Sequence, residues 1–66
     1  MKPQENLTTR EIEILAHLAE GLQNKELAHI LNITEGTVEQ HLKRIYKKLD
    51  VTNRTEAAKQ FYLRYR

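Results

Sequence analysis

The sequence contains no cysteine and no tryptophan, and it has only one proline and two glycines in 66 residues. Without cysteine it can form neither a disulfide scaffold nor a metal site built from thiolates. The three histidines, His17, His29 and His41, are twelve residues apart, and that is not the spacing of metal ligands. We therefore expect no bound metal and no cofactor.

Long apolar runs are missing too. No segment approaches the roughly 20 apolar residues that a membrane-spanning helix requires. Residues 1–6 are polar, and the apolar region of a secretory signal does not follow them. Together with the absence of cysteine, this favours a cytoplasmic protein that does not contact a membrane.

Signatures of catalysis are absent as well. The sequence has no glycine-rich phosphate loop, no nucleophile paired with a base, and no pair of carboxylates in an evident pocket. We predict no catalytic residues and no enzyme activity.

The hydrophobic residues that are present, 39% of the chain, recur at helical spacing. This periodicity predicts an all-α fold, a four-helix bundle-like domain with helices at about 8–20, 24–31, 35–49 and 54–64. A chain of this length forms one domain with a small core. We assign residues 7–66 to that domain and residues 1–6 to a disordered tail.

Capping residues mark the ends of these helices. Thr8 and Glu11 form a capping box for the first helix, and Gly21 can end it in a left-handed conformation. Asn24 is the predicted N-cap of the second helix, because the glutamine before it caps poorly. Asn53 is expected to begin the last helix with a similar box.

Residues 24–49 have the spacing of a helix-turn-helix, in which two helices meet at a tight corner. Ala28 is small enough to let the two helices approach closely. Asn32 lies where the chain must reverse, and asparagine adopts positive φ more readily than other non-glycine residues. Thr34 is a good N-cap, because its hydroxyl can accept the amide hydrogen of Thr37. The alternative is an ordinary antiparallel helix pair in a small bundle.

The predicted helix 35–49 has two different faces. One face carries an apolar stripe at helical spacing, formed by Val38, Leu42, Ile45 and Leu49. The opposite face carries Gly36, Glu39, Gln40, Lys43, Arg44 and Lys47. A helix that buries one face and offers amide and cationic groups on the other suits the major groove of DNA.

Charge is distributed unevenly, although the formal net charge is only +2. Residues 1–39 hold three basic and seven acidic residues, which gives −4. Residues 40–66 hold eight basic and two acidic residues, which gives +6. The asymmetry indicates a polyanion-binding end. The alternative is that the basic residues only coat a solvent-exposed face.

Early residues of helix 35–49 are expected to reach bases and later ones the DNA backbone. Thr37, Gln40 and Lys43 share one side of the helix. Glutamine can pair with adenine, and lysine can donate to guanine or to phosphate. Phosphate contacts are assigned to Arg44, Lys47 and Lys48.

Glu39 is the exception on this face, because it is acidic. It could accept a hydrogen bond from the N4 amino group of cytosine. It could instead form an ion pair with Lys43, four residues further on, and lie beside the groove. We favour the ion pair.

The beginning of helix 24–31 is a second candidate phosphate site. Helix N-termini present free amides, so Asn24 and Lys25 could hold a phosphate there. The alternative is an ordinary capped helix with a surface lysine.

The last helix carries Phe61, Tyr62 and Tyr65, more aromatic surface than one small core can absorb. Part of this face could close the core. We expect part of it to form a homodimer interface.

These residues resemble the LuxR-type helix-turn-helix domain, also called GerE-like, which is found in NarL/FixJ response regulators. The resemblance runs without a gap from Leu7 to about Phe61. The residues that carry it are Leu7, Thr8, Arg10, Glu11, Ile14, Leu15, Gly21, Asn24, Lys25, Glu26, Leu27, Ala28, Leu31, Ile33, Thr34, Thr37, Val38, His41, Ile45, Lys48, Leu49, Val51, Arg54 and Ala57.

The resemblance implies a bacterial transcription regulator that binds paired half-sites on double-stranded DNA as a homodimer, with RNA polymerase as a further candidate partner. It implies DNA contacts at positions 39, 40 and 43, phosphate contacts near Asn24, Lys25 and Lys48, and a structural role for Arg54. The chain departs from the family pattern at three positions, where it has Gln23, Glu39 and Asp50. A different class, a helix-turn-helix module that binds or titrates another regulator, is the alternative.

Overall fold

The computed structural model describes residues 6–65. This part of the chain forms four α-helices, α1 (Thr9–Ala19), α2 (Asn24–Leu31), α3 (Glu35–Leu49) and α4 (Arg54–Arg64). The predicted all-α fold is confirmed, and only α1 differs in its bounds, by one residue at each end. The prediction of a disordered tail falls on residues that lie, except for Asn6, outside the described residues.

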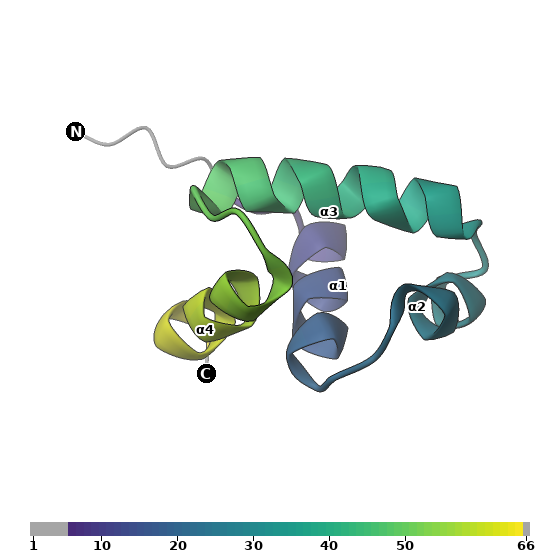
Figure 1. Ribbon diagram of the computed structural model, residues 1–66, viewed down its shortest axis with the longest axis horizontal. Helices are drawn as coiled ribbons and strands as arrows, with labels where there is room; N and C mark the ends of the chain where they lie inside the picture. The colour runs from purple at the N-terminus through teal and green to yellow at the C-terminus, as the bar shows by residue number, and fades with distance from the viewer. Residues whose placement is uncertain (1–5, 66) are drawn as a thin grey trace.

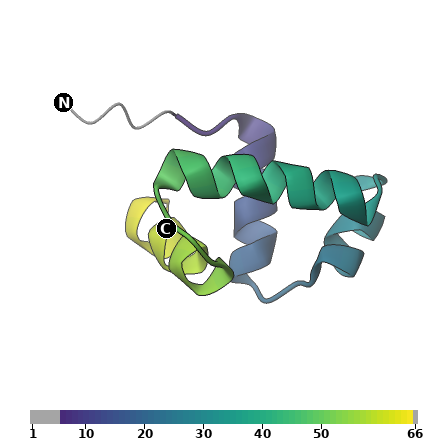
Figure 2. The same ribbon diagram turned by 45° about the horizontal axis from the view of Figure 1, so that its top comes forward.

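The other three helices lie on one side of α3, which is the longest helix (Figure 1). In Figure 1, α3 runs across the top of the molecule, with α1 beneath its middle and α4 and α2 on either side. The turned view in Figure 2 shows the same arrangement, with α3 crossing in front of α1. The closest packing is between α1 and α4 and between α2 and α3. One long face of α3 is thus packed, and the face turned away from the bundle is free.

A single apolar core joins the helices. Its buried members are Leu7, Ile14, Leu15, Leu18, Leu27, Ala28, Leu31, Val38, Leu42, Ile45, Leu49 and Ala57. Val38 and Ile45 have no exposed surface, and Leu42 and Leu49 are at most 5% exposed. The predicted apolar stripe of α3 therefore faces the core, and this fixes the direction of the opposite, polar face.

Three of the helices end in the same way, with a residue in the left-handed region. These residues are Gly21 (φ 98°), Asn32 (φ 59°) and Asp50 (φ 60°). At each end the next residue donates its amide hydrogen to a carbonyl five residues back: Leu22 to His17, Ile33 to Ala28 and Val51 to Tyr46. This is the Schellman pattern, which satisfies carbonyls that the helix leaves unpaired. The predicted turns at Gly21 and Asn32 are confirmed.

The predicted N-caps hold for α1, α3 and α4. Thr8 and Glu11 form the reciprocal capping box, with distances of 3.1 and 2.9 Å between nitrogen and oxygen. Thr34 accepts from the amide of Thr37, and Asn53 accepts from the amide three residues further on.

The predicted N-cap of α2 is wrong. Gln23 occupies the cap position, and its backbone N–H donates to the side-chain carboxylate of Glu26 at 2.7 Å. Asn24 is the first helical residue, and its side-chain oxygen accepts from Arg54 instead. The Asn24 side chain, which could have capped its own helix, is instead hydrogen-bonded to a residue 30 positions further along the chain.

No helix within residues 6–65 is long and apolar enough to cross a bilayer. In the same part of the chain, no three side chains of His, Asp or Glu gather into a group that could hold a metal ion.

Candidate nucleic-acid interface

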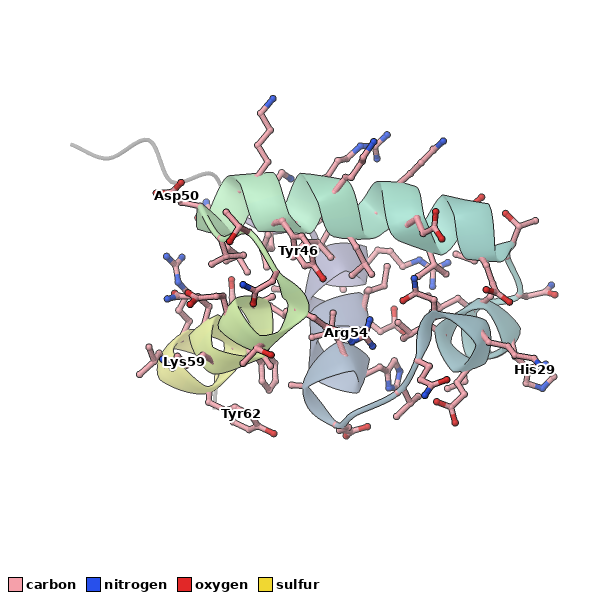
Figure 3. The ribbon with its side chains drawn as sticks, in the orientation of Figure 1. His29, Tyr46, Asp50, Arg54, Lys59 and Tyr62 are labelled. Carbon is pink, nitrogen blue, oxygen red and sulfur yellow. The ribbon has the colours of Figure 1, made fainter. Side chains whose placement is uncertain are left out.

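The outward face of α3 carries the amide and basic side chains that the sequence assigned to DNA. Gln40, Lys43, Arg44 and Lys47 are all exposed. In Figure 3, several nitrogen-tipped side chains extend from α3 away from the other helices. Because the opposite stripe is buried, α3 cannot turn these groups inward without exposing its apolar residues. The fold thus presents a row of hydrogen-bond donors and cations along the exposed face of α3.

The first turn of α3 is fixed by Thr34 and Thr37. The Thr34 hydroxyl accepts from the Thr37 amide at 3.1 Å, and the two hydroxyl oxygens are 2.9 Å apart. The Thr37 side chain is half-buried and already has a hydrogen-bond partner. Its contribution is therefore to stiffen the first turn, and the predicted base contact by Thr37 remains untested.

The N-terminus of α2 provides a second polar surface. Lys25 is exposed there, and the first amides of a helix have no partners within the helix. The Asn24 side chain is half-buried and its oxygen accepts from Arg54 at 3.1 Å, which leaves its side-chain NH2 group and its backbone amide as the donors that a phosphate would need.

Arg54 connects α4 to the start of α2. One guanidinium nitrogen donates to Asn24, and another donates to the backbone carbonyl of Leu22 in the loop before α2. Figure 3 shows Arg54 between α4 and α2, below Tyr46 of α3. Burial raises the pKa of the Tyr46 hydroxyl, and the positive charge of Arg54 partly offsets this rise. The structural role that the resemblance implied for Arg54 is found here.

Lys48 is directed into the protein and has an acidic partner. Its ammonium lies 2.8 Å from the carboxylate of Glu11, with side chains that are 20% and 5% exposed. Burial by itself would raise the pKa of Glu11. Hydrogen bonds from Lys48 and Thr8, together with the charge of Lys48, outweigh burial and lower that pKa. The predicted phosphate contact of Lys48 is untested, but the ion pair with Glu11 already occupies its ammonium group.

Glu39 does not form the ion pair that we favoured from the sequence. Within residues 6–65, Arg10 pairs with Glu13 and Lys48 pairs with Glu11, and a ring nitrogen of His17 lies 3.6 Å from the Glu20 carboxylate. Neither Glu39 nor Lys43 is among them, and both side chains are exposed. The outward face of α3 therefore presents a carboxylate without a partner from the described part of the chain.

The aromatic residues of α4 divide between core and surface. Phe61 is half-buried against the core and contacts the rings of Tyr62 and Tyr65, with centroid distances of 5.6 and 5.9 Å. Tyr62 is 50% exposed and donates to the carbonyl of Ala19 at 3.1 Å. Leu63, which we did not single out from the sequence, is 74% exposed. Its position after two aromatic residues was the available signal.

Helices α2 and α3 meet at a tight corner, and α3 buries an apolar face while it exposes a basic, amide-bearing one. This arrangement defines a helix-turn-helix nucleic-acid-binding domain. Comparison with known proteins identifies the family. Residues 5–61 match the family described as bacterial regulatory proteins, luxR family, and the chain belongs to it. The domain is thus a LuxR-type DNA-binding domain of transcription regulation, as the sequence resemblance implied, and the family is one of regulators and not of enzymes.

Curated proteins to which the chain is similar include transcription regulators. Transcriptional regulatory protein LnrK of Bacillus subtilis is 58% identical, over 86% of this chain and 27% of its own length. Nitrate/nitrite response regulator NarL of Escherichia coli is 50% identical, over 79% of this chain and 24% of its own length. The crystal structure of response regulator ChrA, from a haem-sensing two-component system, superposes with a TM-score of 0.81 at 53% identity, over 88% of this chain and 29% of that chain. The chain thus spans only 24–29% of the length of these proteins.

Proposed function

We propose that this domain binds a specific DNA sequence by inserting α3 into the major groove, with Gln40 and Lys43 at base edges and Arg44 and Lys47 on phosphates. The observation that carries the proposal is the direction of α3, whose apolar stripe is buried while these four side chains are exposed. Lys25 and the free amides at the start of α2 would hold a phosphate at the edge of the same groove.

The test is selection of bound duplexes from a random pool, followed by affinity measurements over a range of salt concentrations. We expect a defined consensus. Each phosphate contact contributes about −0.9 to the slope of log affinity against log salt, so three contacts per protomer give about −3. A flat slope and no enriched sequence would refute DNA binding.

Two substitutions divide base contacts from phosphate contacts. Gln40→Ala is expected to cost about 1–3 kcal/mol at the selected site and to relax one base preference. Lys47→Ala is expected to weaken binding to all sequences alike. If both variants lose the same affinity on selected and on random duplexes, the proposed division of roles is wrong.

We also propose that two copies bind paired half-sites through the outer face of α4. Tyr62, Leu63 and Tyr65 are exposed large apolar or aromatic residues at the end of this helix, and exposed apolar surface favours association. Sedimentation of the wild-type chain with a palindromic duplex should give two protomers per duplex. Leu63→Glu should abolish this stoichiometry, whereas Ile30→Glu, which charges a 50% exposed residue on α2, should leave it intact.

RNA polymerase is the further partner that we propose for a regulator bound beside a promoter, and the bacterial cytoplasm is the compartment that holds both. We assign no catalytic role to the domain.

The alternative, a module that binds another regulator in place of DNA, is supported by one observation. An open, mainly apolar groove on α2 is lined by Leu22, Lys25, Glu26, His29 and Ile30. Suppose that the folded protein selects no duplex from the random pool and yet binds another regulator in a way that Ile30→Glu disrupts. That combination of results would support the protein-binding function and refute DNA binding.

A further inference from the structure

The first two turns of α3 hold a carboxylate and a glycine that neither the fold nor the ion pairs of the protein account for. Glu39 is exposed and has no partner in the described part of the chain. Gly36 is exposed on the same helix. With about 100° per residue, Gly36, Glu39, Gln40 and Lys43 fall within an arc of about 100° on the helix. This arc lies opposite the buried stripe.

Gly36 is not required by the protein's own structure. Its φ is not positive, and a Cβ atom built there would meet only the Thr34 hydroxyl, at 3.8 Å, which is ordinary van der Waals contact. Glycine stabilises a helix less than alanine does, so the chain loses stability at this position. A glycine that neither backbone nor packing demands is suited to close approach of another molecule.

Glu39 is unfavourable on a surface that meets phosphates, because its charge repels them. A carboxylate accepts hydrogen bonds and donates none. In the major groove it is repelled by the N7 and O6 acceptors of guanine and by the O4 acceptor of thymine. Adenine offers an amino group, but its N7 acceptor lies beside it. Cytosine offers the N4 amino group and has no acceptor of its own in the major groove, so it is the base that a carboxylate selects.

We propose that Glu39 determines specificity by accepting a hydrogen bond from the N4 amino group of a cytosine in each half-site, and that Gly36 leaves the space that lets the first turn of α3 approach this base pair. The proposal rests on the DNA-binding function proposed above, and it names the base pair that the binding surface selects.

The test compares the sequences that wild-type and variant proteins select from the same random pool. The wild-type consensus should contain one C·G pair whose replacement weakens binding by about 5- to 10-fold, the lower end of the range for one base contact. Glu39→Ala should remove this preference. Glu39→Gln should shift it toward adenine, because glutamine can donate to N7 and accept from N6.

Glu35→Gln is the matched control for charge. It removes the same charge from the first turn of α3, outside the arc that holds Gly36. It should raise affinity for all duplexes alike and leave the consensus unchanged. If Glu39→Ala has this same uniform effect, Glu39 reads no base and the proposal is wrong.

Gly36→Ala tests the clearance. The variant should be more stable, with Tm higher by up to about 4–8 °C, and it should nevertheless bind the selected duplex more weakly. Gly36→Leu should bind more weakly still. Unchanged binding by both variants would refute the role of Gly36.

The two proposals fail in distinguishable ways. A wild-type protein that selects a consensus and shows a steep salt slope, but keeps that consensus after Glu39→Ala, retains DNA binding and loses the cytosine contact. A wild-type protein that selects no sequence at all loses both.

Discussion

Replacing Lys48 by methionine separates a structural role from a DNA-binding role, because the adjacent Lys47 provides a matched control. Lys47 is exposed on the outward face of α3, whereas the ammonium of Lys48 lies 2.8 Å from the buried carboxylate of Glu11. Methionine keeps most of the length of the lysine side chain and removes its charge. The same substitution at two neighbouring positions should therefore have opposite consequences.

The expected loss of stability follows from the burial of Glu11. Removing one partner of a buried ion pair costs roughly 3–5 kcal/mol. The Lys48 side chain is 20% exposed, which weakens the pair, so we expect Lys48→Met to lower the free energy of unfolding by about 2–3 kcal/mol. In a domain of this size that corresponds to a fall in Tm of about 10–20 °C. Lys47→Met should change stability by less than about 0.5 kcal/mol.

DNA binding should respond in the reverse order. Lys47→Met should reduce the slope of log affinity against log salt by about 1, because one phosphate contact is lost. Lys48→Met should leave that slope unchanged when it is measured at a temperature at which circular dichroism shows the variant folded. A stable Lys48→Met protein with a reduced salt slope would refute the structural role and restore Lys48 to the DNA surface.

The pH dependence gives an independent check on the same pair. The pKa of Glu11 is lower in the folded protein than in the unfolded chain. The Glu11 carboxylate therefore stabilises the fold at any pH above its pKa in the unfolded chain, and this stabilisation is lost as the pH falls through its pKa in the folded protein. In Lys48→Met, the lysine that counteracts the effect of burial on Glu11 is gone, so the pKa of Glu11 should rise. The difference in stability between wild type and variant should therefore narrow as pH falls from 7 to below about 4.5. A constant difference would contradict this account.

Three further predictions concern other features of the fold. Asp50→Gly should raise the free energy of unfolding by about 0.5–1 kcal/mol in urea titrations, because φ is 60° there and an acidic group lies at a helix C-terminus; a destabilised variant would contradict this. Arg54→Lys should lower the free energy of unfolding by about 1.5–3 kcal/mol and reduce the hydrogen-exchange protection of α2, because lysine lacks the planar guanidinium group that reaches both Leu22 and Asn24. Protection of α2 equal to that of the wild type would refute this role of Arg54. Val38→Asp should abolish the cooperative thermal transition, because an unpaired charge would occupy a fully buried position; an unchanged Tm would mean that α3 packs through its other face.

The four helices could be predicted closely because the interactions that define their ends are local. The capping contacts at Thr8, Thr34 and Asn53 join residues three positions apart, and the left-handed turns depend on single residues. The direction of α3 follows from its own apolar stripe. The candidate DNA-binding face is the reverse of that stripe, so it could be predicted as well.

Partners far apart in the sequence could not be predicted from local patterns. Asn24 was expected to cap α2, but its side chain accepts from Arg54, 30 residues away. Lys48 was assigned to phosphate, but it pairs with Glu11, 37 residues away. Glu39 was expected to pair with Lys43 four residues further along, and that pair is not formed.

The sequence by itself determined which residues are helical and which side of each helix is apolar, because these properties depend on spacing and on contacts within one or two turns. Only the tertiary structure decided which charged groups are available to a ligand, because that depends on which distant side chains the packed helices bring within hydrogen-bonding distance. Lys47 and Lys48 are neighbours in the sequence, but the packing of α3 against α1 leaves Lys47 exposed to solvent and pairs Lys48 with Glu11.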